Sequence, residues 1–195
     1  MAIVHSLPPE LEAFRADFDG LADAAEQTAA PLSDDQFNWQ PESGRWSVSQ
    51  CLEHLSATAR AYLPVLDDAI SDAIRRGVDG PGPYQYNFLG RRGVRWMEPP
   101  VTRRFKAPLP FLPQPRRNKQ ETLPAFRAYQ TQYIDRLRQA NGLNMAQARV
   151  HSPLVGYTWI KIPLGSAFAM MIAHERRHLW QARQVLAARA FPGHP

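Results

Sequence analysis

His174-Glu175-Arg176-Arg177-His178 places two histidines four residues apart near the end of a 195-residue chain. The stretch lies within residues 167–189, which contain no Gly or Pro and many strong helix formers, so we expect a helix there. On a helix, side chains four residues apart share a face, with Cβ atoms roughly 5–6 Å apart. Two neutral imidazoles on one face suit a divalent transition metal such as Zn, Ni or Fe.

The same stretch also matches the zincin pattern H-E-x-x-H, in which the glutamate is the general base of a metalloprotease. That chemistry needs a third ligand after the motif. Residues 179–195 contain no Asp or Glu, and their only histidine is His194, close to the chain end. The Gly and His of the longer metzincin pattern are also absent after His178. Protease chemistry therefore has weak support, and we expect Glu175, like Glu53, to lie at the surface or behind the ligands rather than to act directly.

Apolar residues, including Met171 and Val185, share the face of the two histidines on the expected helix. The arginines of the same helix lie elsewhere on the helical wheel. Histidines exposed to solvent would be expected to share a face with those arginines. We therefore place His174 and His178 on or next to the buried face.

Three further segments have the 3.6-residue periodicity of amphipathic helices, over residues 9–30, 47–76 and 118–140. In the second segment, Ser47 and Gln50 have the spacing of a capping box, and Pro64 predicts a kink or a local loss of hydrogen bonding. Together with the C-terminal segment, they predict an all-α fold of four main helices.

Shorter features lie between these segments. Ser33 followed by two acidic residues predicts a short helical turn over residues 33–37. The connection before the last helix contains a strand-like stretch, Tyr157–Ile160. No internal repeat or domain boundary is evident, and we expect residues 1–195 to form a single domain.

His54 lies in the second helical segment, at the margin of its apolar stripe. Metal sites in helical bundles are built from side chains on facing helices, which makes His54 the candidate for a third ligand. Three protein nitrogens would leave coordination positions open to water or substrate, as in catalytic metal sites. The alternative is that the three histidines are boundary residues that hold no metal.

Residues 77–118 differ from the rest of the chain because they hold eight of its 18 prolines. Helices through Pro99-Pro100 or through residues 108–115 are not credible. The segment is also rich in aromatic residues and too long for a plain connection. We interpret it as an ordered, loop-rich excursion that packs across the domain. It is either a lid over a site, a structural crossover or a subunit contact.

The composition excludes several classes of protein. Hydrophobic residues make up 44% of the chain and the net charge is +5, which is typical of a globular protein with a basic surface. We find neither a basic stripe with interleaved aromatics nor a nucleic-acid-binding module, so we expect no nucleic-acid partner. We expect a cytoplasmic protein without a membrane partner, because no apolar run approaches a membrane span and no signal peptide is evident. The single cysteine, Cys51, excludes an intrachain disulfide.

Several stretches together resemble the DinB-like (DinB/YfiT-like) family of metalloenzymes. Trp46–Leu55, W-S-V-S-Q-C-L-E-H-L, is similar to the family's W-S-[IV]-x-x-x-[LI]-x-H-L. His174–Gln181 resembles its C-terminal H-x-x-x-H-x-x-Q. Residues 33–39 and 149–153 look like the segments that precede the family's second and last helices. The likeness covers most of the chain in order.

This resemblance implies a four-helix bundle with up-down-down-up connectivity and a long, here Pro-rich, crossover between helices 2 and 3. It also implies a Zn, Ni or Fe site formed by His54, His174 and His178. Dimers are common in the family, so we expect a homodimer. Characterised relatives include transferases and isomerases that use low-molecular-weight thiols such as bacillithiol, mycothiol or glutathione.

The function we expect is that of a metal-dependent enzyme with a small-molecule substrate, a transferase or isomerase that uses such a thiol. Gln181 lies one turn beyond His178 on the same face and is a candidate to orient a bound water or substrate. The alternative role for Gln181 is ordinary packing at a helix edge. The alternative function is a non-catalytic metal-binding or interaction bundle, and a third is a scaffold whose histidine cluster stays empty.

Overall fold

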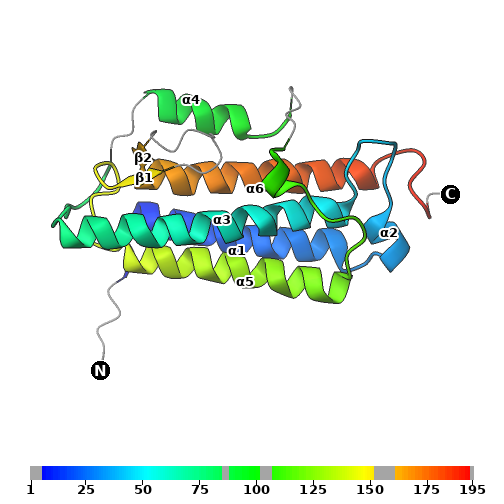
Figure 1. Ribbon diagram of the computed structural model, residues 1–195, viewed down its shortest axis with the longest axis horizontal. Coiled ribbons are helices and arrows are strands. Elements are labelled where there is room, and N and C mark those ends of the chain that lie inside the picture. The colour runs from blue at the N-terminus through cyan, green and yellow to red at the C-terminus, as the bar shows by residue number, and fades with distance from the viewer. Residues whose placement is uncertain (1–5, 85–87, 102–106, 152–160, 194–195) are drawn as a thin grey trace.

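The computed structural model of the protein describes residues 6–84, 88–101, 107–151 and 161–193 (Figure 1). These residues are mostly helical, with six α-helices, one 3-10 helix and one small sheet, which confirms the helical fold class. The elements in chain order are α1 (Pro9–Ala29), α2 (Asp34–Asn38), α3 (Val48–Arg75), α4 (Phe88–Met97), η1 (Leu109–Phe111), α5 (Lys119–Gln139), β1 (Arg149–His151), β2 (Lys161–Pro163) and α6 (Leu164–Leu186).

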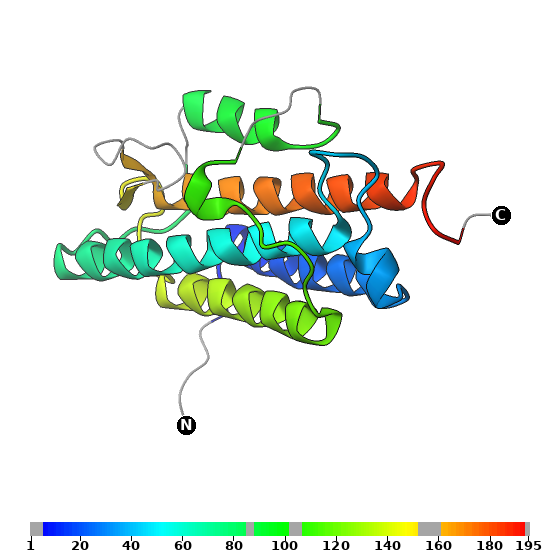
Figure 2. The ribbon, with the colours of Figure 1, turned by 45° about the vertical axis from the view of Figure 1, so that its right-hand side comes forward.

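The four long helices lie side by side, with α1 and α3 each packed against both α5 and α6 (Figures 1 and 2). The colours of Figure 1 show that α1 and α6 run in one direction and α3 and α5 in the other. Their apolar faces meet in one core, whose largest buried side chains include Phe18, Tyr62, Phe126, Tyr133 and Phe168. Burial of side chains of this size contributes most of the stabilisation of such a core, at roughly 1.5–3 kcal/mol each.

Serine residues begin two of the helices as the sequence predicts. At the start of α3, the Ser47 hydroxyl accepts a hydrogen bond from the Gln50 amide at 3.2 Å, and the Gln50 side-chain oxygen accepts one from the Ser47 amide at 3.0 Å. Ser33 and Gln36 form the same capping box at α2. Both boxes satisfy amide groups that would otherwise lack partners at a helix start. The helix α3 continues through Pro64 to Arg75.

Residues 77–118 contain more regular structure than the predicted loop-rich excursion. The ten residues of α4 form a helix between the prolines at 83 and 99, where no proline interrupts the chain. α4 packs along α6, and Gly93 permits a close approach, since a Cβ there would lie 3.1 Å from Cε of Met170 (Figure 1). Packing against α6 therefore stabilises a helix whose two glycines weaken its intrinsic propensity.

A short antiparallel hairpin precedes α6. β1 pairs with β2, with Val150 opposite Ile162, and neither strand was predicted from the sequence. The predicted strand-like stretch, Tyr157–Ile160, lies outside the described residues. Val150 is fully buried against the helical core, so the hairpin fixes the start of α6.

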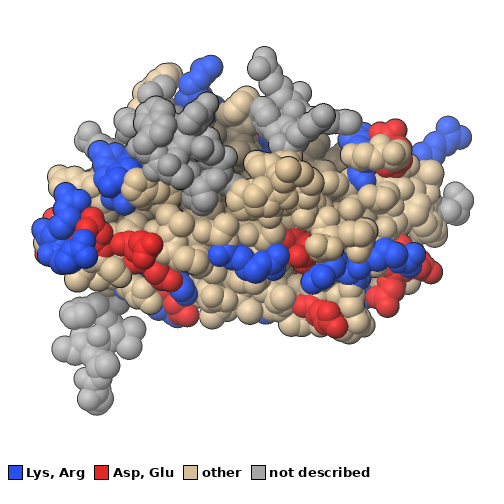
Figure 3. Space-filling model, viewed as in Figure 1, with Lys and Arg blue, Asp and Glu red and all other residues tan. Residues whose placement is uncertain are grey.

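Charged side chains of both signs are interspersed along the face shown in Figure 3, which has no broad region of one sign. Among the described helices, none is both long and apolar enough to cross a membrane. The thiol of Cys51 is completely buried on α3, and burial raises its pKa well above the usual range.

Candidate metal centre

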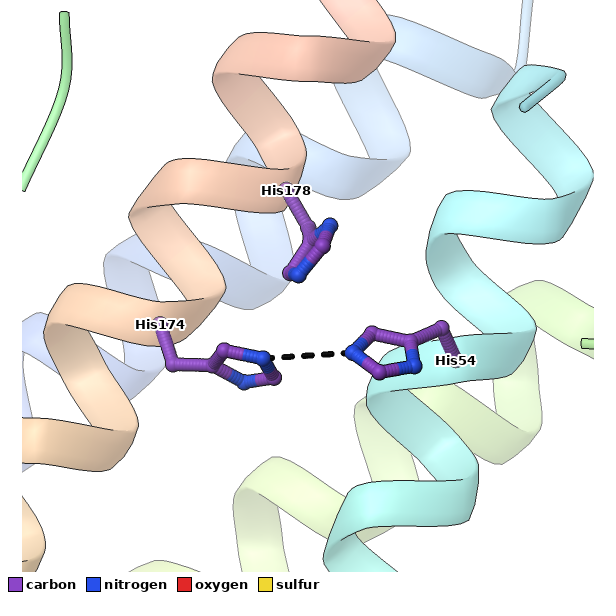
Figure 4. Close-up of side chains that lie close together, drawn as sticks. All are labelled: His54, His174 and His178. Atoms are coloured by element: carbon purple, nitrogen blue, oxygen red, sulfur yellow. Dashed lines mark hydrogen bonds between the residues drawn. The ribbon is translucent and has the colours of Figure 1, made fainter. Parts of the chain in front are cut away.

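The structure brings together the three histidines that the sequence analysis selected. His54 projects from α3, and His174 and His178 project from α6, so that the three rings face one another between the two helices (Figure 4). Each residue offers a ring nitrogen, and these three atoms all lie within 4.8 Å of one another. All three side chains are buried, with exposures of 3%, 6% and 8%. Residues 120 positions apart in the chain thus form one cluster.

A backbone carbonyl orients His54. Its Nδ1 lies 2.7 Å from the carbonyl oxygen of Phe111 in η1. A carbonyl can only accept a hydrogen bond, so Nδ1 carries the proton and donates it. The lone pair of a neutral His54 is therefore on Nε2, the nitrogen that faces the cluster. An outer partner of this kind fixes the tautomer of metal-binding histidines.

His174 supplies the second nitrogen. Its Nε2 lies 3.2 Å from Nε2 of His54, while its Nδ1 is buried and has no hydrogen-bond partner among the described residues (Figure 4). Two nitrogens bound to one tetrahedral zinc ion at about 2.0–2.1 Å lie about 3.3 Å apart. The separation of the two Nε2 atoms therefore fits a shared cation.

His178 completes the cluster, and Gln181 lies beside it. The Oε1 of Gln181 is 3.2 Å from Nδ1 of His178 and accepts its proton when His178 is neutral, which leaves Nε2 free for a ligand role. The indole of Trp46 covers two of the rings, with centroid distances of 4.8 Å to His54 and 5.5 Å to His178. Trp46 stands two residues before α3, and only its place in the family pattern marks it in the sequence.

Burial keeps the cluster uncharged. Desolvation lowers the pKa of His54 and lowers that of His174 to about 3. It also holds the pKa of His178 well below its usual range, and repulsion from the two neighbouring histidines lowers it further. The three imidazoles are therefore neutral at pH 7, which is the form that binds a divalent metal. Three neutral nitrogens suit Zn, Ni or Fe, so the residues fit a transition metal.

The sequence model of the DinB superfamily matches residues 17–182 of the chain. The chain belongs to the DinB superfamily. The matched region runs from within α1 to within α6 and contains all three histidines and Gln181. No curated protein and no solved structure matches the chain.

In this DinB protein, an ion pair connects the segment after η1 to α3, next to His54. Glu53 is buried and forms ion pairs with Arg60 at 3.0 Å and with Arg117 at 3.4 Å. Asn38 accepts a hydrogen bond from the Arg117 amide at 2.8 Å and donates one to the Arg117 carbonyl at 3.0 Å. These ion pairs fit the prediction that Glu53 lies behind the ligands and is not one of them. Its side chain is buried, so it does not lie at the surface. We call residues 109–117 the η1 strap.

Glu175 lies apart from the histidines although it follows His174 directly. It is 2% exposed and points into the bundle, where its Oε1 accepts a hydrogen bond from Nε2 of Gln130 on α5 at 3.3 Å. Its Oε2 has no partner among the described residues, and burial raises the pKa of its carboxyl to about 8. A surface position for Glu175 is therefore wrong. Within the part of the chain that the structure describes, no carboxylate joins the three histidines.

Proposed function

We propose that this DinB protein is a metal-dependent enzyme whose divalent Zn, Ni or Fe ion is held by His54, His174 and His178. The observation that carries the proposal is the arrangement of six ring nitrogens. Nδ1 of His54 donates to Phe111 and Nδ1 of His178 faces Gln181, so that the Nε2 atoms of both are left for a ligand role. Outer partners of this kind are typical of metal-binding histidines. The feature that a core histidine does not need is that the remaining nitrogens of three residues lie within 4.8 Å of one another.

The chemistry that a metal supplies here is Lewis-acid chemistry, which lowers the pKa of a bound thiol or water and polarises a carbonyl. The protein's own residues have three tasks. The histidines would donate neutral nitrogens to the ion and would leave coordination positions open, because no fourth His, Cys, Asp or Glu joins them within the described residues. Phe111 and Gln181 hold the proton-bearing nitrogens of His54 and His178. Trp46 shields two of the rings from water.

The role of Gln181 as a group that contacts water or substrate stays a prediction. Its contact with His178 at 3.2 Å supports a positioning role, because an amide oxygen that accepts the Nδ1 proton fixes the ring orientation. Use of a low-molecular-weight thiol rests on the family resemblance and is proposed on that basis.

A thiol-consumption assay tests the enzyme proposal. Metal-loaded and chelated protein would be incubated with glutathione, bacillithiol or mycothiol and a set of model electrophiles. We expect turnover by the loaded protein that chelation and His54→Ala both abolish. The matched control is His151→Ala, which changes an exposed histidine on β1 outside the cluster. Absence of any metal-dependent turnover, with the metal demonstrably bound, contradicts the thiol chemistry and leaves the metal site standing.

A second candidate function is a non-catalytic metal-binding bundle that docks onto a partner. Four large apolar side chains in the region of α4 and η1 favour it, because Phe88, Trp96, Leu109 and Leu112 are between 48% and 83% exposed. A large exposed apolar patch marks an interaction site, and these side chains would form one if they are contiguous on the surface. Bound metal without turnover, together with concentration-dependent self-association that Leu109→Ser weakens, would favour this function.

We also infer that the long helices have the up-down-down-up connectivity of the family, with residues 77–118 as the crossover between α3 and α5. Support comes from the matching directions of α3 and α5 in Figure 1 and from the packing of each against α1 or α6. The single-domain organisation, the homodimer and the cytoplasmic location stay predictions.

A further inference from the structure

A second candidate site lies between α4 and the first turns of α6, away from the histidines. It is an open-sided pocket of about 360 Å3 with almost entirely apolar walls. Gly90 and Val94 of α4 and Ala169 of α6 form part of these walls. None of the three clustered histidines lines it. Its volume lies at the lower end of the range of small-molecule sites.

Two arginines that pair with none of the described residues stand at this pocket. Arg91 and Arg95 are one helical turn apart on α4 and both line it. Neither has an ion pair or hydrogen bond with any described residue, whereas most other arginines of the described chain are paired with an acid. The only acid in the lining, Glu98, is bound by Arg176 at 2.7 Å. Arg91 and Arg95 are exposed at the rim of the pocket, and the acid that lines it is already paired with another arginine.

The opposite wall carries the hydroxyl and amide of Ser166, which also lack partners within the described part of the chain. Ser166 is 6% exposed and lines the pocket, and its hydroxyl has no hydrogen-bond partner among the described residues. Ser166 is the third residue of α6, so its amide is one of the donors that a helix start leaves free. The amides of Leu164 and Gly165 already donate to the carbonyls of Ala148 and Met145, at 2.9 and 3.0 Å. The hydroxyl and amide of Ser166 are therefore available to a ligand. The positive end of the α6 dipole favours an anion at this position.

We propose that this pocket binds a small amphipathic carboxylate, with the acid group between Arg91, Arg95 and Ser166 and the apolar part against Val94 and Ala169. Guanidinium groups and helix-start donors are the partners that a carboxylate prefers. The apolar walls distinguish this ligand from a bare inorganic anion, which would leave them in contact with water. Ala169 precedes His174 by five residues, roughly 7–8 Å along the helix. The proposal does not depend on the metal chemistry proposed above.

Titration calorimetry of the full-length protein with octanoate tests the site. We expect one octanoate per chain, and an affinity at least about tenfold above that for 1-octanol, which lacks the charge. The double variant Arg91→Gln with Arg95→Gln should weaken octanoate binding by about tenfold or more. Ser166→Ala should weaken it by about fivefold, the usual worth of one hydrogen bond.

Arg92 provides a matched control, because it is an exposed arginine on the same helix that does not line the pocket. Arg92→Gln should leave the affinity within about twofold, since it removes only a long-range charge. An equal loss in Arg92→Gln would overturn the site in favour of general surface charge. Equal affinities for octanoate and 1-octanol, or for octanoate and inorganic phosphate, would overturn the amphipathic carboxylate.

The last comparison is between protein with an intact metal centre and protein without one. Octanoate binding should be the same in His54→Ala and in chelated protein as in the wild type. Loss of binding in His54→Ala, with binding retained in the double arginine variant, would place the carboxylate at the histidines and overturn the proposal. Failure of the thiol assay with octanoate binding intact would affect only the proposed enzyme function.

Discussion

Two sides of α6 each bury polar side chains, and they do so differently. On the side facing α3, His174 and His178 meet His54, and three ring nitrogens converge within 4.8 Å. On the side facing α5, Glu175 meets the amide of Gln130 at 3.3 Å, and one oxygen of each residue is left without a partner among the described residues. Burial favours the neutral form on both sides, since it lowers the pKa of the histidines and raises that of Glu175 to about 8.

The difference shows that burial alone does not make a metal site. Both sides are desolvated, but only the histidine side presents several lone pairs to one point. The glutamate side lacks a donor, and protonation of Glu175 would supply one. A divalent cation should therefore bind on the histidine side only, whereas a proton should stabilise the glutamate side only. The following changes test the two sides separately.

Removal of a histidine should have the largest effect. His174→Ala takes away one of three nitrogen donors, so metal affinity should fall by more than the roughly 10–100-fold that loss of an outer partner costs. Elemental analysis and competition with a chelator would measure this, starting from about one metal per chain. Glu175→Gln is the matched change on the other side of α6 and should leave the metal content unchanged. Equal losses in both variants would show that the two sides are not independent.

Gln181→Leu should have the next largest effect and should also be confined to the histidine side. It removes the acceptor at 3.2 Å from Nδ1 of His178, so metal affinity should fall by roughly 10–100-fold while the fold is kept. Gln181→Glu keeps an acceptor oxygen and should restore most of the affinity. If both variants bind metal like the wild type, Gln181 does not position His178.

Glu175→Gln should alter the pH dependence of stability. The pKa of Glu175 is raised by folding, so the unfolded chain loses this proton at a lower pH than the folded chain. Wild-type stability should therefore fall as pH rises from the unfolded pKa near 4.5 to about 8. Relative to wild type, the variant should gain about 2 kcal/mol in free energy of unfolding between pH 6 and pH 8.5.

Denaturant unfolding of chelated protein at the two pH values would measure this gain. The histidines contribute equally to both proteins, so they cancel from the difference. Glu26→Gln, at an exposed position of α1, is the control and should show no such gain. A difference between wild type and Glu175→Gln that does not change with pH would contradict a neutral Glu175 in the fold.

Asn38→Ala should have the smallest effect, and it tests what covers the histidine side. α5 faces the glutamate side, whereas the η1 strap covers the histidine side and is fastened through Asn38 to both backbone groups of Arg117. Loss of these bonds should lower the free energy of unfolding by about 1–2 kcal/mol. Metal affinity should fall only slightly, because Phe111 still accepts from His54. A metal loss as large as that of His174→Ala would make the strap a main determinant of the site.

The sequence was sufficient to predict the long helices, because their positions follow from apolar periodicity and caps. The Ser47 box and the start of α5 after Asn118 agree with local rules. It was insufficient for α4, whose ten residues hold three arginines and two glycines and depend on packing against α6. Tertiary contact decides such a helix, and local propensity does not reveal it.

In the candidate site, too, some features could be predicted from the sequence and others could not. The grouping of His54 with His174 and His178 was expected from helix faces and from the family resemblance, and the structure brings the three together. The Phe111 carbonyl was not expected, because every residue has a carbonyl and this one lies 57 positions from its partner. The burial of Glu175 was missed for a related reason, since its partner Gln130 is 45 positions away on another helix.

The buried Cys51 gives the protein an internal reporter. It is the only cysteine of the chain and lies one turn before His54 on α3, closed off from solvent. A thiol-labelling reagent can therefore react only when this part of α3 opens, so the labelling rate measures the opening of the helix that carries His54. Labelling with and without added zinc would then give the free energy that the ion contributes to keeping α3 closed. No engineered probe is required for that measurement.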